Sequence, residues 1–159
     1  MEWDPQQIKN DFLKVSQIAN LKLTSKNIEV EVLRKPHSPP KKLPNNSMAI
    51  YVFSWDSTVM KVGKAGSKTK QRYTSQHYSP KGARSTLAAS ILSEAERFGL
   101  SETDQLNIGN WIRTNTDRVN FLVPITFGIF TLNLLEAFLH CRLNPYFEGY
   151  QSQRLSKDW

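Results

Sequence analysis

Apolar residues at the start of the chain recur every three to four positions, which is the spacing of an amphipathic helix. Ile8 and Phe12 mark the apolar face, and Asp4 and Pro5 stand before it as an N-cap and a first helical residue. The pattern therefore predicts a helix over residues 5–19.

Shorter apolar runs further along the chain predict strands. Residues 28–32 alternate between apolar and acidic side chains, as in a half-exposed strand. Runs at 49–53 and 59–63 flank a polar turn and predict a β-hairpin, and a further run at 118–123 ends before Pro124. These runs together predict a small sheet.

Helical spacing returns between the hairpin and the last strand, and again after that strand. A helix is expected to begin within 69–78, another to end at Gly99, and the last to stop at Asn144 and Pro145. The longer helices are predicted over 85–98, 101–114 and 127–143. A sheet with helices packed against it, an α+β fold, follows from this order.

Residues 34–47 (RKPHSPPKKLPNNS) are rich in proline and in basic residues, so they cannot form regular structure. Two interpretations remain open for this segment: an extended arm that lies on the surface or on a ligand, and a solvated linker.

Positive charge is concentrated in the middle of the chain. The formal net charge is +7, and no Asp or Glu occurs from Ser57 to Ser93. A polyanion is the natural partner of such a segment, although RNA, anionic lipid or plain solubility would account for a basic surface as well as DNA does. The residues expected either to contact DNA phosphates or to form a solvated charged face are Lys68, Lys70, Lys81 and Arg84.

The composition also indicates a compartment. The single cysteine, Cys141, excludes an internal disulfide, suits a reducing compartment and lies in an apolar helical pattern, which favours a core position. No apolar run is long enough to span a membrane, and the N-terminal segment lacks the pattern of a signal peptide. A cytoplasmic protein without a membrane partner is expected.

One carboxylate interrupts the apolar pattern of the last predicted helix. Glu136 follows Leu132 by four residues and precedes Leu139 by three, so it shares their face. A carboxylate that faces a core needs a cation, a metal ion or hydrogen-bond donors. The alternatives are an ion pair with an Arg or Lys, a position at the edge of the apolar stripe, and a site for a hard cation such as Mg²⁺.

An ordered set of residues resembles the GIY-YIG nuclease superfamily over residues 48–149. The set consists of Ala49-Ile50-Tyr51, Lys61-Val62-Gly63, Arg72, Glu136 and Pro145. The resemblance implies a three-stranded antiparallel sheet flanked by helices, and one Mg²⁺ or Mn²⁺ ion held by Glu136. It leaves residues 1–47 as an N-terminal helix and basic arm, and 150–159 as a tail.

The resemblance also implies an activity, the Mg²⁺-dependent hydrolysis of DNA by an endonuclease. Tyr51 matches the general base, and nearby cations would favour its phenolate, since a free phenol has a pKa of about 10. Arg72 matches the arginine that contacts the scissile phosphate, and Lys64 a lysine after the second triplet that contacts DNA. A further active-site residue of the family would fall on Gln76, so a small shift in position assigns it to His77, which we favour, or to Tyr78.

Three residues depart from the family pattern: Ala49, Lys61 and Glu148. Lys61 replaces the tyrosine that most members have at this position, a substitution that some restriction enzymes of the family share. We therefore expect Lys61 to be a catalytic residue. The departures also support a second hypothesis, a catalytically inactive module of the same fold that binds nucleic acid. Cutting both strands of a duplex usually needs two active sites, so a homodimer is a further expectation.

Overall fold

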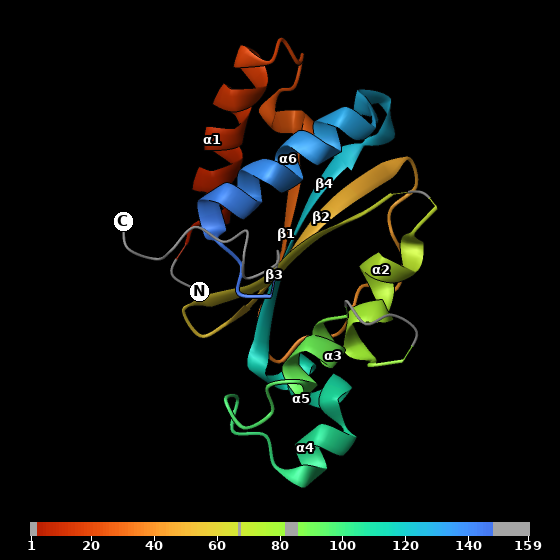
Figure 1. The fold of residues 1–159 in the computed structure, drawn as a ribbon. Helices are drawn as coiled ribbons and strands as arrows, with labels where there is room; N and C mark the ends of the chain where they lie inside the picture. The colour runs from red at the N-terminus through yellow and green to blue at the C-terminus, as the bar shows by residue number, and fades with distance from the viewer. Residues whose placement is uncertain (1–2, 67, 82–85, 148–159) are drawn as a thin grey trace.

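Helices pack on both faces of one antiparallel sheet (Figure 1). The computed structural model describes residues 3–66, 68–81 and 86–147. The strands are β1 (Glu29–Leu33), β2 (Ser47–Trp55), β3 (Thr58–Ala65) and β4 (Thr116–Pro124), in the order β1-β4-β2-β3. The fold is α+β, as predicted.

The sheet has four strands instead of the three that the family resemblance implies. The additional strand is β1, which pairs with β4 from Glu29 opposite Leu122 to Leu33 opposite Arg118. Its alternating residues were predicted to form a strand, and pairing with the free edge of β4 satisfies their backbone groups. The two edges of the sheet are therefore β1 and β3.

The hairpin of β2 and β3 is longer than its apolar runs. Its tight turn contains Asp56 with a φ of 50°, a left-handed conformation that Asp adopts more readily than most residues. Tyr51 lies opposite Gly63 and Phe53 opposite Lys61. The register thus places these four side chains on one face of the sheet.

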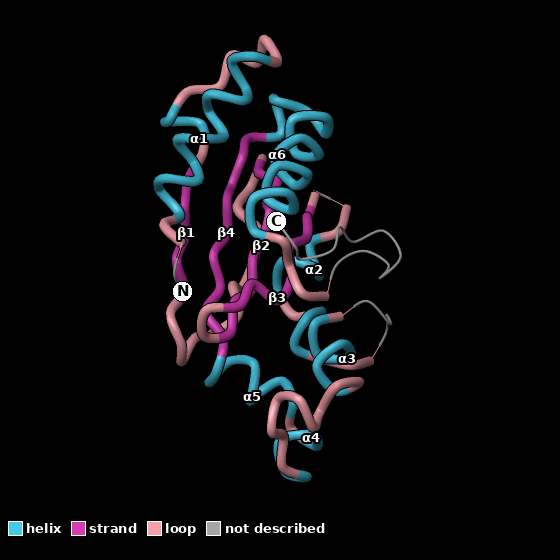
Figure 2. Tube along the Cα trace, turned by 60° about the vertical axis from the view of Figure 1, so that its left-hand side comes forward, coloured by secondary structure: helices cyan, strands magenta, loops and turns pink. Residues whose placement is uncertain are grey.

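One face of the sheet is covered by α1 (Pro5–Ile18) and α6 (Gly128–Leu143), which run close together in Figures 1 and 2. Ile8 and Phe12 share a buried cluster with Leu132, Leu135 and Leu139. The Asp4 carboxylate accepts a hydrogen bond from the Gln6 backbone N–H, which confirms the predicted N-cap.

The other face is covered by α2 (Lys70–Thr74), α3 (Leu87–Leu92) and α5 (Ile108–Asn115), with α4 (Glu102–Leu106) beyond them (Figure 2). Short 3-10 turns, η1 (Ser25–Asn27), η2 (Gln76–Tyr78) and η3 (Ile125–Phe127), connect the elements. Phe53, Tyr73, Ile91 and Ile112 are among the buried residues of this second cluster. The sheet is thus the middle of three layers.

Two predicted helices differ from the observed ones. The helix predicted over 85–98 is shorter, Leu87–Leu92, and the chain continues in turns over 93–99. The hydroxyls of Ser90 and Ser93 donate to backbone carbonyls about one turn back. The helix predicted over 101–114 is divided at Asn107 into α4 and α5. The capping box of Ser101 and Asp104 is present as predicted.

The basic arm has no regular structure over 34–46, as predicted, and most of its residues are at least partly exposed, but two of them reach the core. His37 and Leu43 are buried. The His37 Nδ1–H donates to the Thr116 carbonyl oxygen at 2.9 Å, and His37 Nε2 accepts from the Tyr78 hydroxyl at 2.8 Å. The arm therefore closes over the start of β4.

Cys141 is exposed, contrary to its predicted core position. It lies two residues beyond Leu139 and so faces away from the buried stripe of α6. Within the described residues, no helix is long and apolar enough to span a membrane.

Candidate active site

A pocket of about 140 Å³ opens beside β3, at the edge of the sheet. It brings together all five residues that the sequence predicts to be catalytic, together with Lys64. The residues that line it are Tyr51, Lys61, Val62, Gly63, Lys64, Arg72, Gln76, His77 and Glu136. These residues come from β2, β3, α2, η2 and α6, which are far apart in the sequence.

The position of β3 at the sheet edge allows both faces of the sheet to contribute to the pocket. Tyr51 and Lys61 belong to the face covered by α2, whereas Lys64 bonds to residues of α6 on the opposite face. An interior strand would separate these two groups of side chains. The free edge lets them meet around one strand.

Gly63 makes room for the phenol of Tyr51. A Cβ atom on Gly63 would lie 2.5 Å from Tyr51 Oη and 2.7 Å from two ring carbons. Real side chains do not approach so closely, so the tyrosine ring can lie across β3 only because residue 63 is glycine. The glycine of the second triplet, Gly63, thus leaves the space that the tyrosine of the first triplet, Tyr51, occupies.

The hydroxyl of Tyr51 is 2.7 Å from Nε2 of His77. The backbone N–H of Leu87 donates to His77 Nδ1 at 3.2 Å, so Nδ1 carries no proton. The neutral ring then carries its proton on Nε2 and donates it to Tyr51 Oη. His77 is consequently a fixed hydrogen-bond donor to the phenol oxygen and not a base toward it.

The surroundings keep His77 neutral. His77 is only 3% exposed to solvent. Burial, together with the nearby charges of Lys61, Arg118 and Arg72, lowers the pKa of His77 to about 3 from an ordinary value of 6.5. His77 is therefore a buried, neutral residue of the pocket wall.

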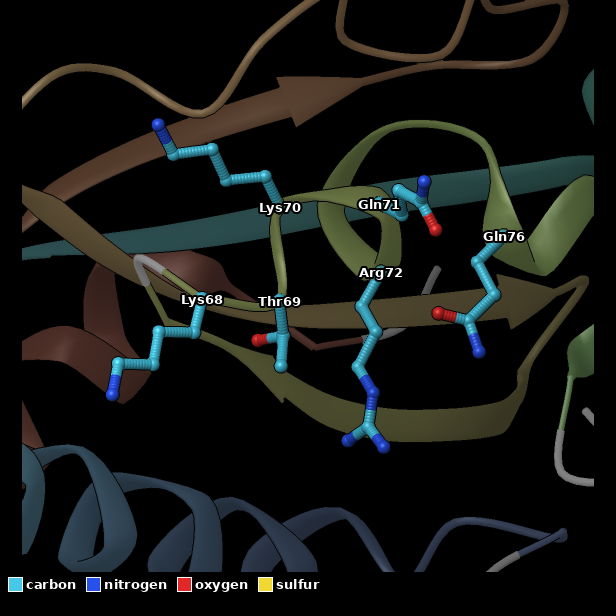
Figure 3. Close-up of a pocket in the computed structure, with 6 residues that line it drawn as sticks. All are labelled: Lys68, Thr69, Lys70, Gln71, Arg72 and Gln76. Carbon is cyan, nitrogen blue, oxygen red and sulfur yellow. The ribbon is translucent and has the colours of Figure 1, made fainter.

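Cationic side chains line the pocket together with the phenol. Lys61 is buried in the pocket. Arg72 and Gln76 line both this pocket and a shallower hollow beside it, to which Lys68, Thr69, Lys70 and Gln71 also contribute. Figure 3 shows the side chains of Arg72 and Lys68 pointing from the α2 region toward α6, whereas Lys70 points the other way.

Glu136 forms an ion pair with Lys64, one of the alternatives that its sequence position left open. Lys64 Nζ donates to Glu136 Oε2 at 2.6 Å and to Asn133 Oδ1 at 2.9 Å. The side chain of Glu136 is 20% exposed, so it lies at the rim of the apolar stripe and faces the pocket. The carboxylate is thus neutralised by the lysine predicted to contact DNA.

The donor set fits a metal ion held by one carboxylate. The described residues contain no group of three or more His, Cys, Asp or Glu side chains that could surround a metal ion. Mg²⁺ keeps several waters and is often held by one or two carboxylates together with substrate phosphates. Glu136 at the pocket rim could therefore serve as the protein ligand of such an ion. Such an ion would take the place of Lys64 Nζ on Glu136.

The cations predicted to bind DNA are not all in one place. Lys64 and Lys68 lie on the side of the pocket that faces α6, Lys70 points away from it, and Lys81 is exposed beyond η2. Arg84 and Glu148 lie outside the described residues. The predicted surface therefore divides into a part beside the pocket and a part distant from it.

Two polar residues near the pocket were not found by sequence reasoning. Asn133 bonds to Lys64, and Arg118 lies beneath the pocket in the core. Asn133 is three residues before Glu136, a spacing that places both on one face of a helix and could have indicated a shared partner. No pattern along the chain distinguishes Arg118 from a surface arginine.

Comparisons with family models, with curated proteins and with solved structures find no significant match to the chain. The geometry of the pocket is therefore the basis for the function proposed below.

Proposed function

We propose that the protein is a Mg²⁺-dependent endonuclease of the GIY-YIG type that hydrolyses phosphodiester bonds of DNA. The observation that carries this proposal is the hydrogen bond from His77 to Tyr51 inside a pocket that also contains Lys61, Arg72 and Glu136. A phenol that receives a fixed donor among cations is equipped to act as a base. A carboxylate at the same pocket is equipped to hold a metal ion.

Tyr51 would take the proton of the attacking water. Its phenolate is stabilised by the Nε2–H of His77 and by the positive charges of Lys61 and Arg72. Because His77 is neutral and Leu87 fixes its tautomer, the imidazole donates to the phenol oxygen in both protonation states of Tyr51.

Arg72 would bind the scissile phosphate. Its guanidinium lines the pocket and can place two N–H groups on non-bridging oxygens, where negative charge grows in the transition state. Glu136 would hold the Mg²⁺ ion, which when bound neutralises charge on the phosphate and on the leaving oxygen. Lys64, released from Glu136, would be free to contact the DNA backbone.

The inactive nucleic-acid-binding module is supported by one specific observation. Lys64 already neutralises Glu136 at 2.6 Å, so the carboxylate needs no metal ion for its stability. In such a protein the same cations would bind phosphates, and Tyr51 and His77 would be packing residues. Metal binding at Glu136 separates the two functions.

The decisive experiment combines cleavage and calorimetry. Plasmid, single-stranded DNA and RNA are incubated with the protein, with and without Mg²⁺ or Mn²⁺, and Mg²⁺ binding is measured by titration calorimetry. We expect cleavage that requires the metal ion and that falls by at least about a hundredfold in Tyr51→Phe and Glu136→Gln. Heat from Mg²⁺ binding should be lost in Glu136→Gln.

Two substitutions serve as matched controls. Tyr146→Phe removes a hydroxyl that bonds to Glu94 outside the pocket, and Glu102→Gln removes an exposed carboxylate at the start of α4. Both should cleave as the wild type does. Nucleic-acid binding without cleavage and without Mg²⁺ heat would replace the endonuclease by the binding module.

A further inference from the structure

Arg118 is a fully buried cation that the proposed reaction does not use. It lies on β4 with a relative exposure of 0%, and it forms no ion pair within the described residues. A buried charge without a counterion is costly unless hydrogen bonds compensate for its lost hydration. Its position therefore needs an explanation.

The guanidinium is held by three neutral groups. Its Nε donates to Asn120 Oδ1 at 2.8 Å, one terminal nitrogen donates to the Tyr73 carbonyl oxygen at 2.6 Å, and the other to the Tyr78 hydroxyl at 3.3 Å. The bond to Asn120 fixes the arginine on its own strand, and the bonds to Tyr73 and Tyr78 join β4 to α2 and η2. The charge is satisfied by hydrogen bonds rather than by a carboxylate.

The partners of Arg118 are direct neighbours of pocket residues. Tyr73 follows Arg72 in α2, and Tyr78 follows His77 in η2. By bonding to both tyrosines, the guanidinium ties the segment that carries Arg72 and His77 to the middle of the sheet. A small shift of this segment would move both side chains relative to Tyr51.

Arg118 also lies behind the phenol itself. Its guanidinium carbon is 5.6 Å from the centre of the Tyr51 ring, and 5.1 Å from the centres of the Phe53 and Tyr73 rings. A cation at this distance from a phenol favours its ionised form in a medium less polar than water. The charge thus acts from the core, where solvent cannot screen it.

Within the register of the sheet, Glu31 lies opposite Asn120 and Asn120 lies opposite Tyr51. Glu31 Oε2 accepts hydrogen bonds from Asn120 Nδ2 at 2.6 Å and from the Tyr73 hydroxyl at 2.9 Å. The negative charge of Glu31 is therefore connected to Arg118 through Asn120 but kept two strands away from Tyr51.

We propose that Arg118 is a positioning residue of the active site, which holds the Arg72–His77 segment against the sheet and supplies a permanent positive charge behind the phenol of Tyr51. This inference rests on the proposed function, since it gives the buried charge a role in the ionisation of the base. Among the described residues, the other charged or titratable groups around Tyr51 and Arg118 are Glu31 on β1, Lys61 and Lys64 on β3, Arg72 and Tyr73 on α2, His77 and Tyr78 on η2, Glu136 on α6, His37 in the arm, Arg113 on α5 and Asp117 on β4.

The test separates the charge of Arg118 from its hydrogen bonds. The ionisation of Tyr51 is followed by NMR in metal-free protein labelled at tyrosine Cζ, with the Tyr51 resonance assigned as the one missing from Tyr51→Phe. Arg118→Met should raise the pH of ionisation by about one unit. Arg118→Lys keeps the charge, so it should leave that pH nearly unchanged while slowing cleavage about tenfold through the lost fork of bonds.

A polar substitution keeps the test decisive if Arg118→Met does not fold. Arg118→Gln retains an N–H donor at this position but removes the charge, so it too should raise the pH of Tyr51 ionisation by about one unit. A purely structural arginine would give the same ionisation in every folded Arg118 variant, and that result would overturn the inference. Absence of cleavage by the wild type would refute the endonuclease alone, because the NMR titration does not depend on it.

Discussion

The buried imidazole of His77 should make the protein sensitive to mild acid. The pKa of His77 is lowered to about 3 in the folded protein, against 6.5 for an unperturbed histidine. Between these two values the unfolded chain binds a proton that the folded protein does not. Stability therefore rises with pH across this window, and it is lost as the pH falls from about 6.5 toward 3.

The size of the effect follows from the difference between the two pKa values. Each pH unit below the unfolded value costs about 1.4 kcal/mol, so lowering the pH from 7.5 to 5.0 should reduce the free energy of unfolding by about 2 kcal/mol through His77 alone. The folded protein has only on the order of 10 kcal/mol of stability, so this loss is readily measured.

The assay is urea denaturation at pH 7.5 and pH 5.0, followed by tryptophan fluorescence, for the wild type and for His77→Gln. Glutamine retains an N–H that can reach Tyr51 but does not titrate. The loss of unfolding free energy between the two pH values should therefore be about 2 kcal/mol smaller in His77→Gln than in the wild type. The pKa of His37 is also lowered by burial, but His37 is present in both proteins and its contribution cancels. His140→Gln, at the end of α6, is the control and should behave as the wild type does. Equal losses in the wild type and His77→Gln would refute the assignment of a buried, neutral imidazole.

Two further predictions concern the pocket. Gly63→Ala should displace the Tyr51 phenol and reduce cleavage about a hundredfold with little change in DNA affinity. Gly66→Ala is the control and should cleave normally, because its Cβ would meet nothing within 4 Å. Full activity of Gly63→Ala in steady-state assays would contradict this geometry. Lys64→Met removes the ammonium group that competes for Glu136, so calorimetry should show severalfold tighter Mg²⁺ binding, and an unchanged affinity would exclude Glu136 as the ligand.

Elements governed by neighbours in the sequence were predictable. The first helix and its Asp4 cap, the hairpin around Asp56 and the stop of α6 at Asn144, whose φ is 43°, all depend on local spacing and on residues that favour caps or turns. The helix at Leu87–Leu92 was predicted too long, because apolar spacing does not distinguish a helix from the turns that follow it over 93–99.

Contacts between distant segments were not predictable in the same way. The pairing of β1 with β4 and the burial of His37 depend on groups that lie about eighty to ninety residues away along the chain. For the site, the family resemblance indicated which residues to consider, but not that Leu87 fixes the tautomer of His77 or that Lys64 neutralises Glu136. A resemblance specifies residue types, whereas protonation and pairing depend on the assembled fold.

The Lys64–Glu136 ion pair gives the carboxylate in the apolar helix α6 a structural explanation that needs no metal ion. The cost of facing Glu136 toward the core is met by an ammonium group at 2.6 Å, so the carboxylate alone is not evidence for a metal ion. The phenol of Tyr51 is more informative, because packing alone requires neither the glycine that makes room for its ring nor an imidazole whose tautomer is fixed to donate to its oxygen. Tyr51 and its surroundings are therefore the stronger support for the proposed catalysis, and the calorimetric titration tests the metal ion at Glu136.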